Sequence, residues 1–185
     1  MSKRDDIVTA ADRLFYEQGF EATSFADIAG AVGISRGNFY YHFKTKDEIL
    51  DAVIAARLRD RKTLLSDWDM QDGDPLSNIR RFIDILIVNG DKIKHFGCPL
   101  GTLSSELAKL NHPAQKDANA LFTLFRDWLS QQFSALGCAD KSDELAMHLL
   151  ARSQGVATLA NAFRDDAFIR QEVEDMAQWA ADQIP

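Results

Sequence analysis

Two very short helical segments near the N-terminus limit the fold more than any other part of the chain. Ser24 and Asp27 form an S-x-x-D capping signature that starts the first segment, and Gly33 ends it. Ser35 is placed to cap the second segment, RGNFYYHF at residues 36–43. Two helices of this length that are joined by a tight glycine turn predict a helix-turn-helix.

The second segment has an apolar side and a polar side. Phe39 and Phe43 are four residues apart, so both rings are expected to point inward. There they would share a core with Ile28, Val32 and Ile34. With Tyr40 on the flank, the helical period points the remaining side chains outward: Gly37, Asn38, Tyr41 and His42.

The outward set has the chemistry of a DNA-binding surface. Tyrosine hydroxyls, a histidine, lysines and a serine-capped helix N-terminus are phosphate ligands, whereas Arg36 and Asn38 can reach base edges. Gly37 would let the helix approach the groove closely. The chain carries a net charge of −7, yet no Asp or Glu stands between Asp27 and Asp47. One local phosphate-binding face is therefore compatible with an acidic protein; a helical hairpin with solvated polar side chains is the alternative.

The rest of the chain shows helical periodicity without the alternation of a strand, so we expect an all-α fold. A helix at residues 3–18 precedes the helix-turn-helix, and the capping box Thr45-x-x-Glu48 opens a long helix after it. A polar loop, DMQDGDP, is expected beyond about residue 68. Further helices are expected from Pro75, around 101–109, from NHP at 111–113 to Gly137, at about 140–163 and at about 168–183.

The composition favours a cytoplasmic protein. It is 46% hydrophobic, which is enough to bury a core, but its apolar runs fall short of the roughly 20 residues of a membrane span. The N-terminus lacks the apolar stretch of a signal peptide. Cys98 and Cys138 have neither CxxC spacing nor a histidine at zinc-ligand spacing, so we expect free thiols. No metal and no cofactor is expected.

The N-terminal segment resembles the TetR family of bacterial transcriptional repressors. The resemblance rests on RLFYEQGFEATSFADIAGAVG and GISRGNFYYHFKTKDEIL, which contains Gly-x-x-Tyr-Tyr-His-Phe-Lys-x-Lys, and it runs over about residues 5–55. It implies a three-helix helix-turn-helix DNA-binding head at residues 1–47. The remainder, residues 48–185, would be an all-helical body of about six helices for ligand binding and dimerisation.

The resemblance also implies the DNA-contacting residues. Among those carried over by position, Tyr41, His42 and Lys46 are expected on phosphates, and Arg36 and Gly37 nearer to bases together with Tyr40. The full set is Thr23, Ser35, Arg36, Gly37, Asn38, Tyr40, Tyr41, His42 and Lys46.

The last two predicted helices carry the candidate dimer interface. In the first of them, apolar residues follow alternating steps of four and three, which is the pattern of a seam with another helix. The resemblance implies a four-helix bundle made by these two helices of each subunit; an intrachain hairpin is the alternative. A palindromic operator in double-stranded DNA needs two heads about one helical turn apart, which favours a homodimer. The interface candidates are Leu149, Arg152, Val156, Leu159, Phe163, Val173, Met176 and Ala180.

Aromatic and aliphatic residues on the middle helices form the candidate ligand pocket. An ordinary hydrophobic core is the alternative, but a cavity for a partly apolar inducer of unknown identity is the prediction. Cys98 lies in GCPLG just before a helix N-terminus, a position that favours thiolate chemistry. That segment resembles one in an electrophile- and oxidant-responsive TetR subgroup, whereas the alternative is a small buried cysteine in a turn. The pocket candidates are Phe82, Leu86, Phe96, Cys98, Leu100, Phe122, Phe125 and Trp128.

These features together predict a regulator and no enzyme. The leading hypothesis is a homodimeric repressor that a small-molecule inducer releases from its operator. A DNA-binding dimer whose body takes a protein partner is one alternative. A helical small-molecule enzyme with an incidental N-terminal motif is the other, although the sequence contains no nucleophile elbow, P-loop or metal-binding helix motif.

Overall fold

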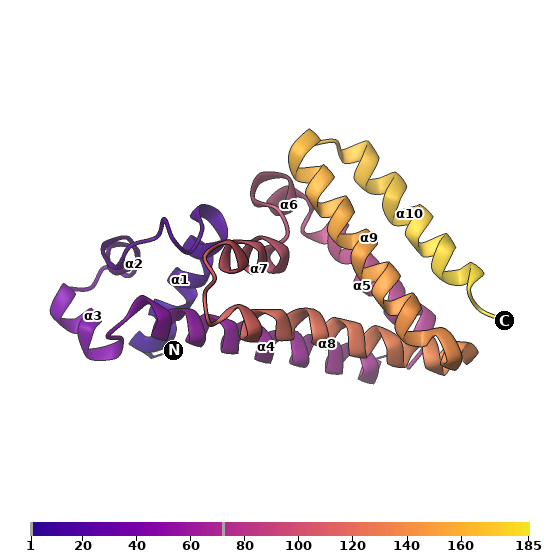
Figure 1. The fold of residues 1–185 in the computed structure, drawn as a ribbon, viewed down its shortest axis with the longest axis horizontal. Helices are drawn as coiled ribbons and strands as arrows, with labels where there is room; N and C mark the ends of the chain where they lie inside the picture. The colour runs from indigo at the N-terminus through magenta and orange to yellow at the C-terminus, as the bar shows by residue number, and fades with distance from the viewer. Residues whose placement is uncertain (1, 72) are drawn as a thin grey trace. The chain divides into compact units, whose positions relative to one another are not determined.

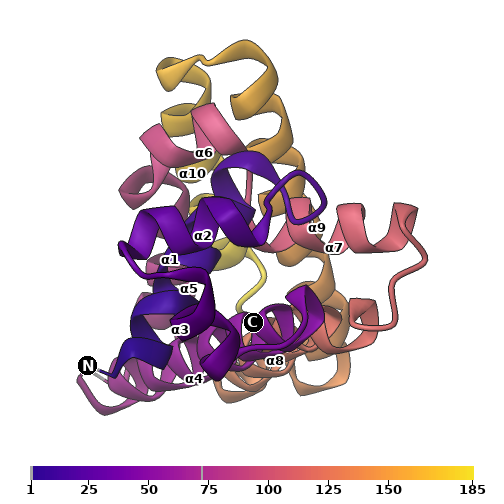
Figure 2. The ribbon, with the colours of Figure 1, turned by 90° about the vertical axis from the view of Figure 1, so that its left-hand side faces the viewer.

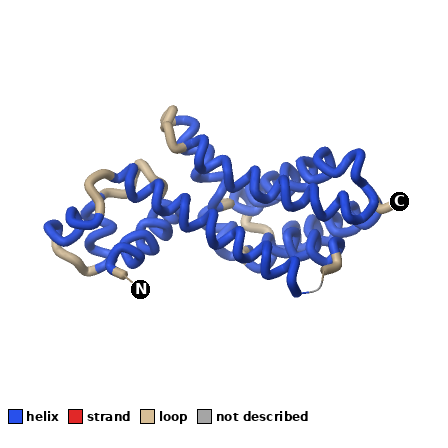
Figure 3. Tube along the Cα trace, turned by 90° about the horizontal axis from the view of Figure 1, so that it is seen from below, coloured by secondary structure: helices blue, strands red, loops and turns tan. Residues whose placement is uncertain are grey.

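The protein is built from helices joined by short connections, as the computed structural model shows (Figure 3). The structure describes residues 2–71 and 73–185, and no strand occurs within these two ranges. The all-α prediction is confirmed. None of the described helices is long and apolar enough to cross a bilayer.

The first of two structural units comprises Met1–Arg61 and Pro99–Leu121. The beginning of a long helix, α4 (Lys46–Gln71), belongs to this unit, and its end belongs to the other. Figure 2 presents the helix-turn-helix of this unit toward the viewer. The helices that lie wholly within the unit are α1 (Lys3–Gln18), α2 (Phe25–Val32), α3 (Arg36–His42) and α7 (Pro99–Lys109).

A single hydrophobic core joins α7 to the N-terminal helices, although α7 is distant in sequence. Leu103 and Leu107 of α7 are buried in the same cluster as Ile7 and Leu14 of α1, and α7 packs against α1. The α4 residues Ile49, Leu50, Val53 and Ile54 also belong to this cluster. The core residues that the helix-turn-helix contributes are Ile28, Ala29, Phe39 and Phe43.

The second unit comprises Lys62–Cys98 and Phe122–Pro185. Within it, α10 packs against both α5 and α9, and α6 packs against α9 (Figure 1). The helix α8 (Gln115–Phe133) begins in the first unit and ends in this one. The helices that lie wholly within this unit are α5 (Pro75–Val88), α6 (Gly90–Phe96), α9 (Ser142–Phe163) and α10 (Asp166–Asp182).

Several helix boundaries differ from the sequence-based expectation, and one helix is additional. The helix α4 continues to Gln71 through the start of the predicted loop, and α7 begins at Pro99 instead of near residue 101. The short helix α6 was not predicted as a separate element: Asn89, its N-cap residue, makes no side-chain capping hydrogen bond, so the sequence carries no capping signature there. The expected domain boundary between residues 47 and 48 stays a prediction.

Candidate nucleic-acid interface

Local hydrogen bonds hold the two short helices in the predicted form. The Ser24 hydroxyl and backbone N–H both donate to the Asp27 carboxylate, which holds the pKa of Asp27 below its usual value. Gly33 has a φ of 70°, in the left-handed region that glycine adopts without steric cost, and it ends α2. The Ser35 hydroxyl accepts from the Asn38 N–H at 3.3 Å and caps α3.

The inner side of α3 is anchored as predicted. Phe39 and Phe43 are each only 1% exposed, and the rings of Phe39 and Phe25 meet edge to face with their centroids 5.2 Å apart. Partly buried Val32 and Ile34 pack against the same cluster. A helix of seven residues is too short to be stable alone, so this packing is what holds α3 in place.

The outer side of α3 brings most of the predicted DNA contacts together. Tyr41 is 79% exposed and Tyr40 is 45% exposed. The Tyr41 ring meets the partly exposed His42 ring edge to face, with a centroid distance of 5.2 Å. A Cβ atom at Gly37 would meet nothing within 4 Å, so the backbone is open there. The other exposed members of the set are Ser35, Arg36 and Asn38.

Thr23 and Lys46 are placed differently from this set. Thr23 is 1% exposed, and its hydroxyl donates to the Gly19 carbonyl at 2.7 Å. The Lys46 ammonium donates to three backbone carbonyls of the α1–α2 connection and lies 4.4 Å from the Phe20 ring centroid. A lysine has three N–H donors, so these bonds use all of them. Both side chains hold the α1–α2 connection in this structure.

A second contact to the α1–α2 connection comes from α7. The Glu106 carboxylate accepts the backbone N–H groups of Phe20 and Glu21, each at 2.9 Å.

Arg57 of α4 joins α1 to α7. It is only 7% exposed, and it donates to the Asp12 carboxylate at 2.6 Å and to the Pro99 carbonyl at 2.8 Å. Sequence reasoning missed these residues, because their partners are far apart in the chain and no local motif marks them.

The predicted ligand-pocket residues lie in two environments. Phe82, Leu86, Phe125 and Trp128 are each about 5–6% exposed, and the rings of Phe82 and Phe125 lie 5.5 Å apart. Their packing is that of a hydrophobic core. The other four are partly exposed, with Phe96 at 37%: Phe96, Cys98, Leu100 and Phe122.

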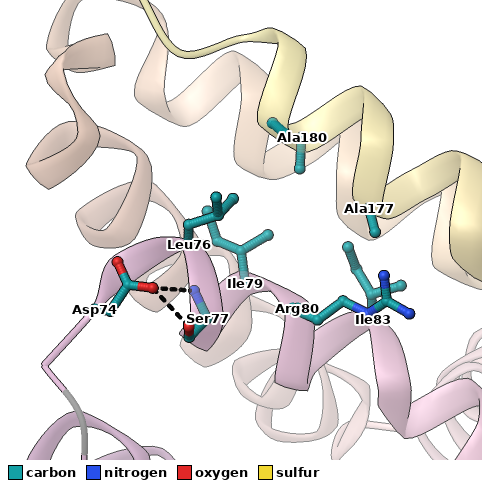
Figure 4. Close-up of a pocket in the computed structure, with 9 residues that line it drawn as sticks. Asp74, Leu76, Ser77, Ile79, Arg80, Ile83, Ala177 and Ala180 are labelled. Atoms are coloured by element: carbon teal, nitrogen blue, oxygen red, sulfur yellow. Dashed lines mark hydrogen bonds between the residues drawn. The ribbon is translucent and has the colours of Figure 1, made fainter.

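One open pocket of about 240 Å³ lies elsewhere, between α5 and α10 (Figure 4). Ala177 and Ala180 of α10 face Leu76 and Ile79 of α5, and the short alanine side chains leave the space. None of the eight predicted pocket residues lines it. The remaining lining residues are Asp74, Ser77, Arg80, Ile83 and Ala181.

The thiols and histidines form no metal centre in the described ranges. No group of three or more His, Cys, Asp or Glu side chains there could hold a metal ion. Neither cysteine is in a disulfide; Cys98 is partly exposed, whereas Cys138 is buried and donates its thiol hydrogen to the Gln183 carbonyl at 3.3 Å.

The predicted dimer residues divide between the interior of the chain and its surface. Five are buried by packing within the chain: Leu149, Val156, Val173, Met176 and Ala180. Arg152 of α9 pairs with Glu172 of α10 at 3.0 Å. Leu159 and Phe163 are 43% and 74% exposed. They belong to a stripe of small and apolar exposed residues on α9, called here the α9 stripe: Met147, Ala151, Gly155, Thr158, Leu159, Ala162 and Phe163.

Comparison with protein families finds matches over both parts of the chain. The family of bacterial regulatory proteins described as tetR matches residues 7–53. A second family, the C-terminal domain of LmrA/YxaF-like transcriptional regulators, matches residues 75–174, which is more than half of the chain.

Individual proteins match over most of the chain as well. An uncharacterized HTH-type transcriptional regulator in the lacX 3' region of Lactococcus lactis subsp. lactis is 32% identical over 166 residues, 88% of this chain and 85% of that protein. The HTH-type transcriptional repressor DhaR of Mycobacterium sp. (strain GP1) is 24% identical over 68% of this chain and 61% of its own length. The crystal structure of a TetR transcriptional regulator from Legionella pneumophila superposes with a TM-score of 0.85 at 26% identity, covering 96% of this chain and 97% of that one.

Proposed function

Because this chain belongs to the TetR family of DNA-binding transcriptional regulators, we propose that it is a repressor that binds a palindromic operator as a homodimer. The observation that carries the proposal is the division of α3: Phe39 and Phe43 are buried, while Tyr41 is 79% exposed. This arrangement presents one polar helix face to the major groove. The relative DhaR, which is named as a repressor, favours repression over activation. A bacterial repressor works on the chromosome, so we place it in the cytoplasm.

The proposed contacts are those of the exposed face of α3. Tyr41 and His42 bind phosphates, because a phenol and an imidazole N–H donate to phosphate oxygens without reading sequence. Arg36 and Tyr40 lie nearer to bases, and Gly37 allows the backbone to approach the groove. Ser35 and Asn38 complete the set. We assign Thr23 and Lys46 to holding the α1–α2 connection, since their polar hydrogens are already donated within the chain.

We propose that the two subunits meet through the α9 stripe. Scattered exposed apolar residues are ordinary, but a continuous stripe at helical spacing is suited to another helix. The small residues Ala151, Gly155 and Ala162 allow a close approach, and Leu159 and Phe163 supply apolar area to bury. An interface of this kind between identical subunits is self-complementary about a two-fold axis, which matches the symmetry of a palindromic site.

We propose further that a partly apolar small molecule binds the body and lowers DNA affinity. The helix α4 supports this, because it runs unbroken from Lys46 into the second unit, so a tilt of its body end moves its head end. The ligand can release DNA only by as much as its affinities for the two conformations differ. The buried packing of Phe82 and Phe125 keeps the alternative of a protein partner in place of a ligand open. The regulators among the relatives count against an enzyme.

Selection of binding sites from random duplex DNA tests the proposal. The expected product is a palindromic sequence with half-sites about one helical turn apart. Candidate compounds are then added to the purified complex, and an inducer lowers the bound fraction. Recovery of no enriched sequence, with the protein folded and dimeric, contradicts the proposed function.

Replacing Tyr41 by Ala or Phe is expected to weaken DNA binding about 10- to 150-fold, because one hydrogen bond to a charged group contributes about 1.5–3 kcal/mol. Tyr41 is 79% exposed, so the fold is unaffected. The loss is expected to be equal on the selected operator and on random duplex, because phosphate contacts carry no sequence information. Equilibrium titrations on both duplexes measure it, and a loss confined to the operator contradicts the phosphate assignment.

Replacing Cys98 by Ser tests whether the thiol takes part in induction. If a thiol-reactive compound releases DNA by modifying Cys98, the variant is expected to retain DNA binding and to lose the response completely, since a serine hydroxyl is not a thiolate nucleophile. Cys138→Ser is the matched control, because that thiol is buried. A response that survives in Cys98→Ser and disappears in Cys138→Ser refutes the assignment.

A further inference from the structure

An arginine outside the family motif lies against the end of α3. Arg4, in the first turn of α1, places its guanidinium carbon 4.5 Å from the centroid of the Phe43 ring. The ring itself is 1% exposed, whereas Arg4 is exposed, so the guanidinium covers the outer side of a core residue. Phe43 directly follows His42, one of the proposed phosphate ligands. Arg4 precedes residues 7–53, the interval that the tetR family model matches.

Within the described residues, the Arg4 guanidinium over the Phe43 ring forms no hydrogen bond and no ion pair, so its N–H donors are available. A guanidinium stacks through its flat face, and its five N–H groups point outward in the same plane. In the described part of the chain, no carboxylate forms an ion pair with Arg4; the neighbouring Asp5 accepts hydrogen bonds from Ser2 instead. The contact with the ring therefore holds the guanidinium beside the end of α3, while its N–H groups have no hydrogen-bond acceptor within the described residues.

The other Lys and Arg side chains of the head show why the unused donors of Arg4 are significant. Arg36 at the start of α3 also has no ion pair within the described residues, so α3 has one arginine beside each end. Every remaining basic side chain up to residue 46 already has a partner: Lys3 with Asp6, Arg13 with Glu17, Lys44 with the Tyr40 carbonyl, and Lys46 with the α1–α2 connection. At the C-terminal end of α3, Arg4 is thus the arginine whose N–H donors have no partner within the described residues.

We infer that Arg4 is a further DNA-contacting residue, which donates to a backbone phosphate beside those bound by Tyr41 and His42. The inference rests on the proposed DNA-binding role of α3. A planar, fixed guanidinium matches the two oxygens of a phosphate, and a group on α1 outside the recognition helix contributes affinity without reading bases. The contact adds to the salt dependence of binding, because each neutralised phosphate releases its counterions.

The test compares Arg4→Met with Arg13→Met. A methionine still covers the Phe43 ring but carries no charge, and Arg13 is an exposed arginine of the same helix that is paired with Glu17 at 2.9 Å. Affinity is measured on the selected operator and on random duplex over a range of salt concentrations. For Arg4→Met, we expect the negative slope of log K against log salt to become shallower by about 0.9 for each Arg4 in the complex. Arg13→Met and the charge-conserving Arg4→Lys are expected to keep the slope.

The outcomes separate this inference from the proposed function. An unchanged slope in a folded Arg4→Met protein overturns the phosphate contact, as does a lower melting temperature with an unchanged slope, which would make Arg4 only a cover for the core. A loss on the operator alone also overturns it. If Tyr41→Ala weakens binding and Arg4→Met does not, only this inference fails. If the wild-type protein binds no duplex at all, the proposed function fails first.

Discussion

Gly155→Arg is expected to turn the proposed dimer into a monomer and to lower operator affinity by about a thousandfold, within the range that loss of a linked second binding event produces. Gly155 lies in the middle of the α9 stripe, and a Cβ atom there meets nothing within 4 Å in its own chain. The substitution therefore leaves the subunit intact. At a helix–helix contact, however, it inserts a long charged side chain where two backbones approach, and burying that charge unpaired is costly.

Sedimentation measures the mass of the variant in solution, and titration with operator and half-operator duplexes measures its affinity. The expected monomer binds both duplexes equally weakly, because it can engage only one half-site. Gly30→Arg is the matched control for the oligomeric state: Gly30 is also helical and exposed, has open space at its Cβ position, and belongs to α2 and not to the stripe. A Gly155→Arg protein that stays dimeric shows that the subunits meet elsewhere.

Local features of the chain were predictable because their causes are local. The capping box of Ser24 and Asp27 appears in the structure as written in the sequence, and so does the start of α5, where Asp74 accepts the Ser77 N–H at 3.0 Å ahead of Pro75. The division of α3 into two sides follows from the turn angle of a helix alone. Such features depend on residues within one or two turns.

Where no local signal exists, sequence reasoning fails or leaves alternatives. The helix α6 has no capping side chain, and α4 runs on to Gln71 because Met, Gln and Asp can continue a helix when no glycine or proline stops it. Thr23 and Lys46 belong to the family pattern. Only the folded α1–α2 connection shows that their polar hydrogens are donated to backbone carbonyls of the same chain. No motif in the sequence around Glu106 indicates that its carboxylate accepts the N–H groups of that connection.

The two C-terminal helices, α9 and α10, show a different limit of prediction from sequence. Steps of four and three identify a helix face that packs against another helix, but they do not say whether that helix belongs to the same chain. Leu149 and Val156 pack within the chain, whereas Leu159 and Phe163 remain exposed on the neighbouring side of α9. The exposure of each side chain in the folded subunit separates the residues that pack within the chain from those of the α9 stripe. The sequence alone does not contain this information.

Phe39→Ala is expected to lower the free energy of unfolding of the first structural unit by about 3–5 kcal/mol, the usual cost of removing a buried phenyl ring and leaving a cavity. Phe39 is 1% exposed and stands edge to face against Phe25, so few neighbouring atoms can move in to fill the space. Because α3 has seven residues and depends on this packing, operator binding is expected to fall with stability. Denaturant unfolding measures the first effect and DNA titration the second. Tyr41→Ala is the matched control on the same helix: its side chain is 79% exposed, so that variant loses affinity while its unfolding midpoint stays the same. If Phe39→Ala unfolds like the wild type, α3 is not held by its inner face, and the assignment of its outer face to DNA loses its physical basis.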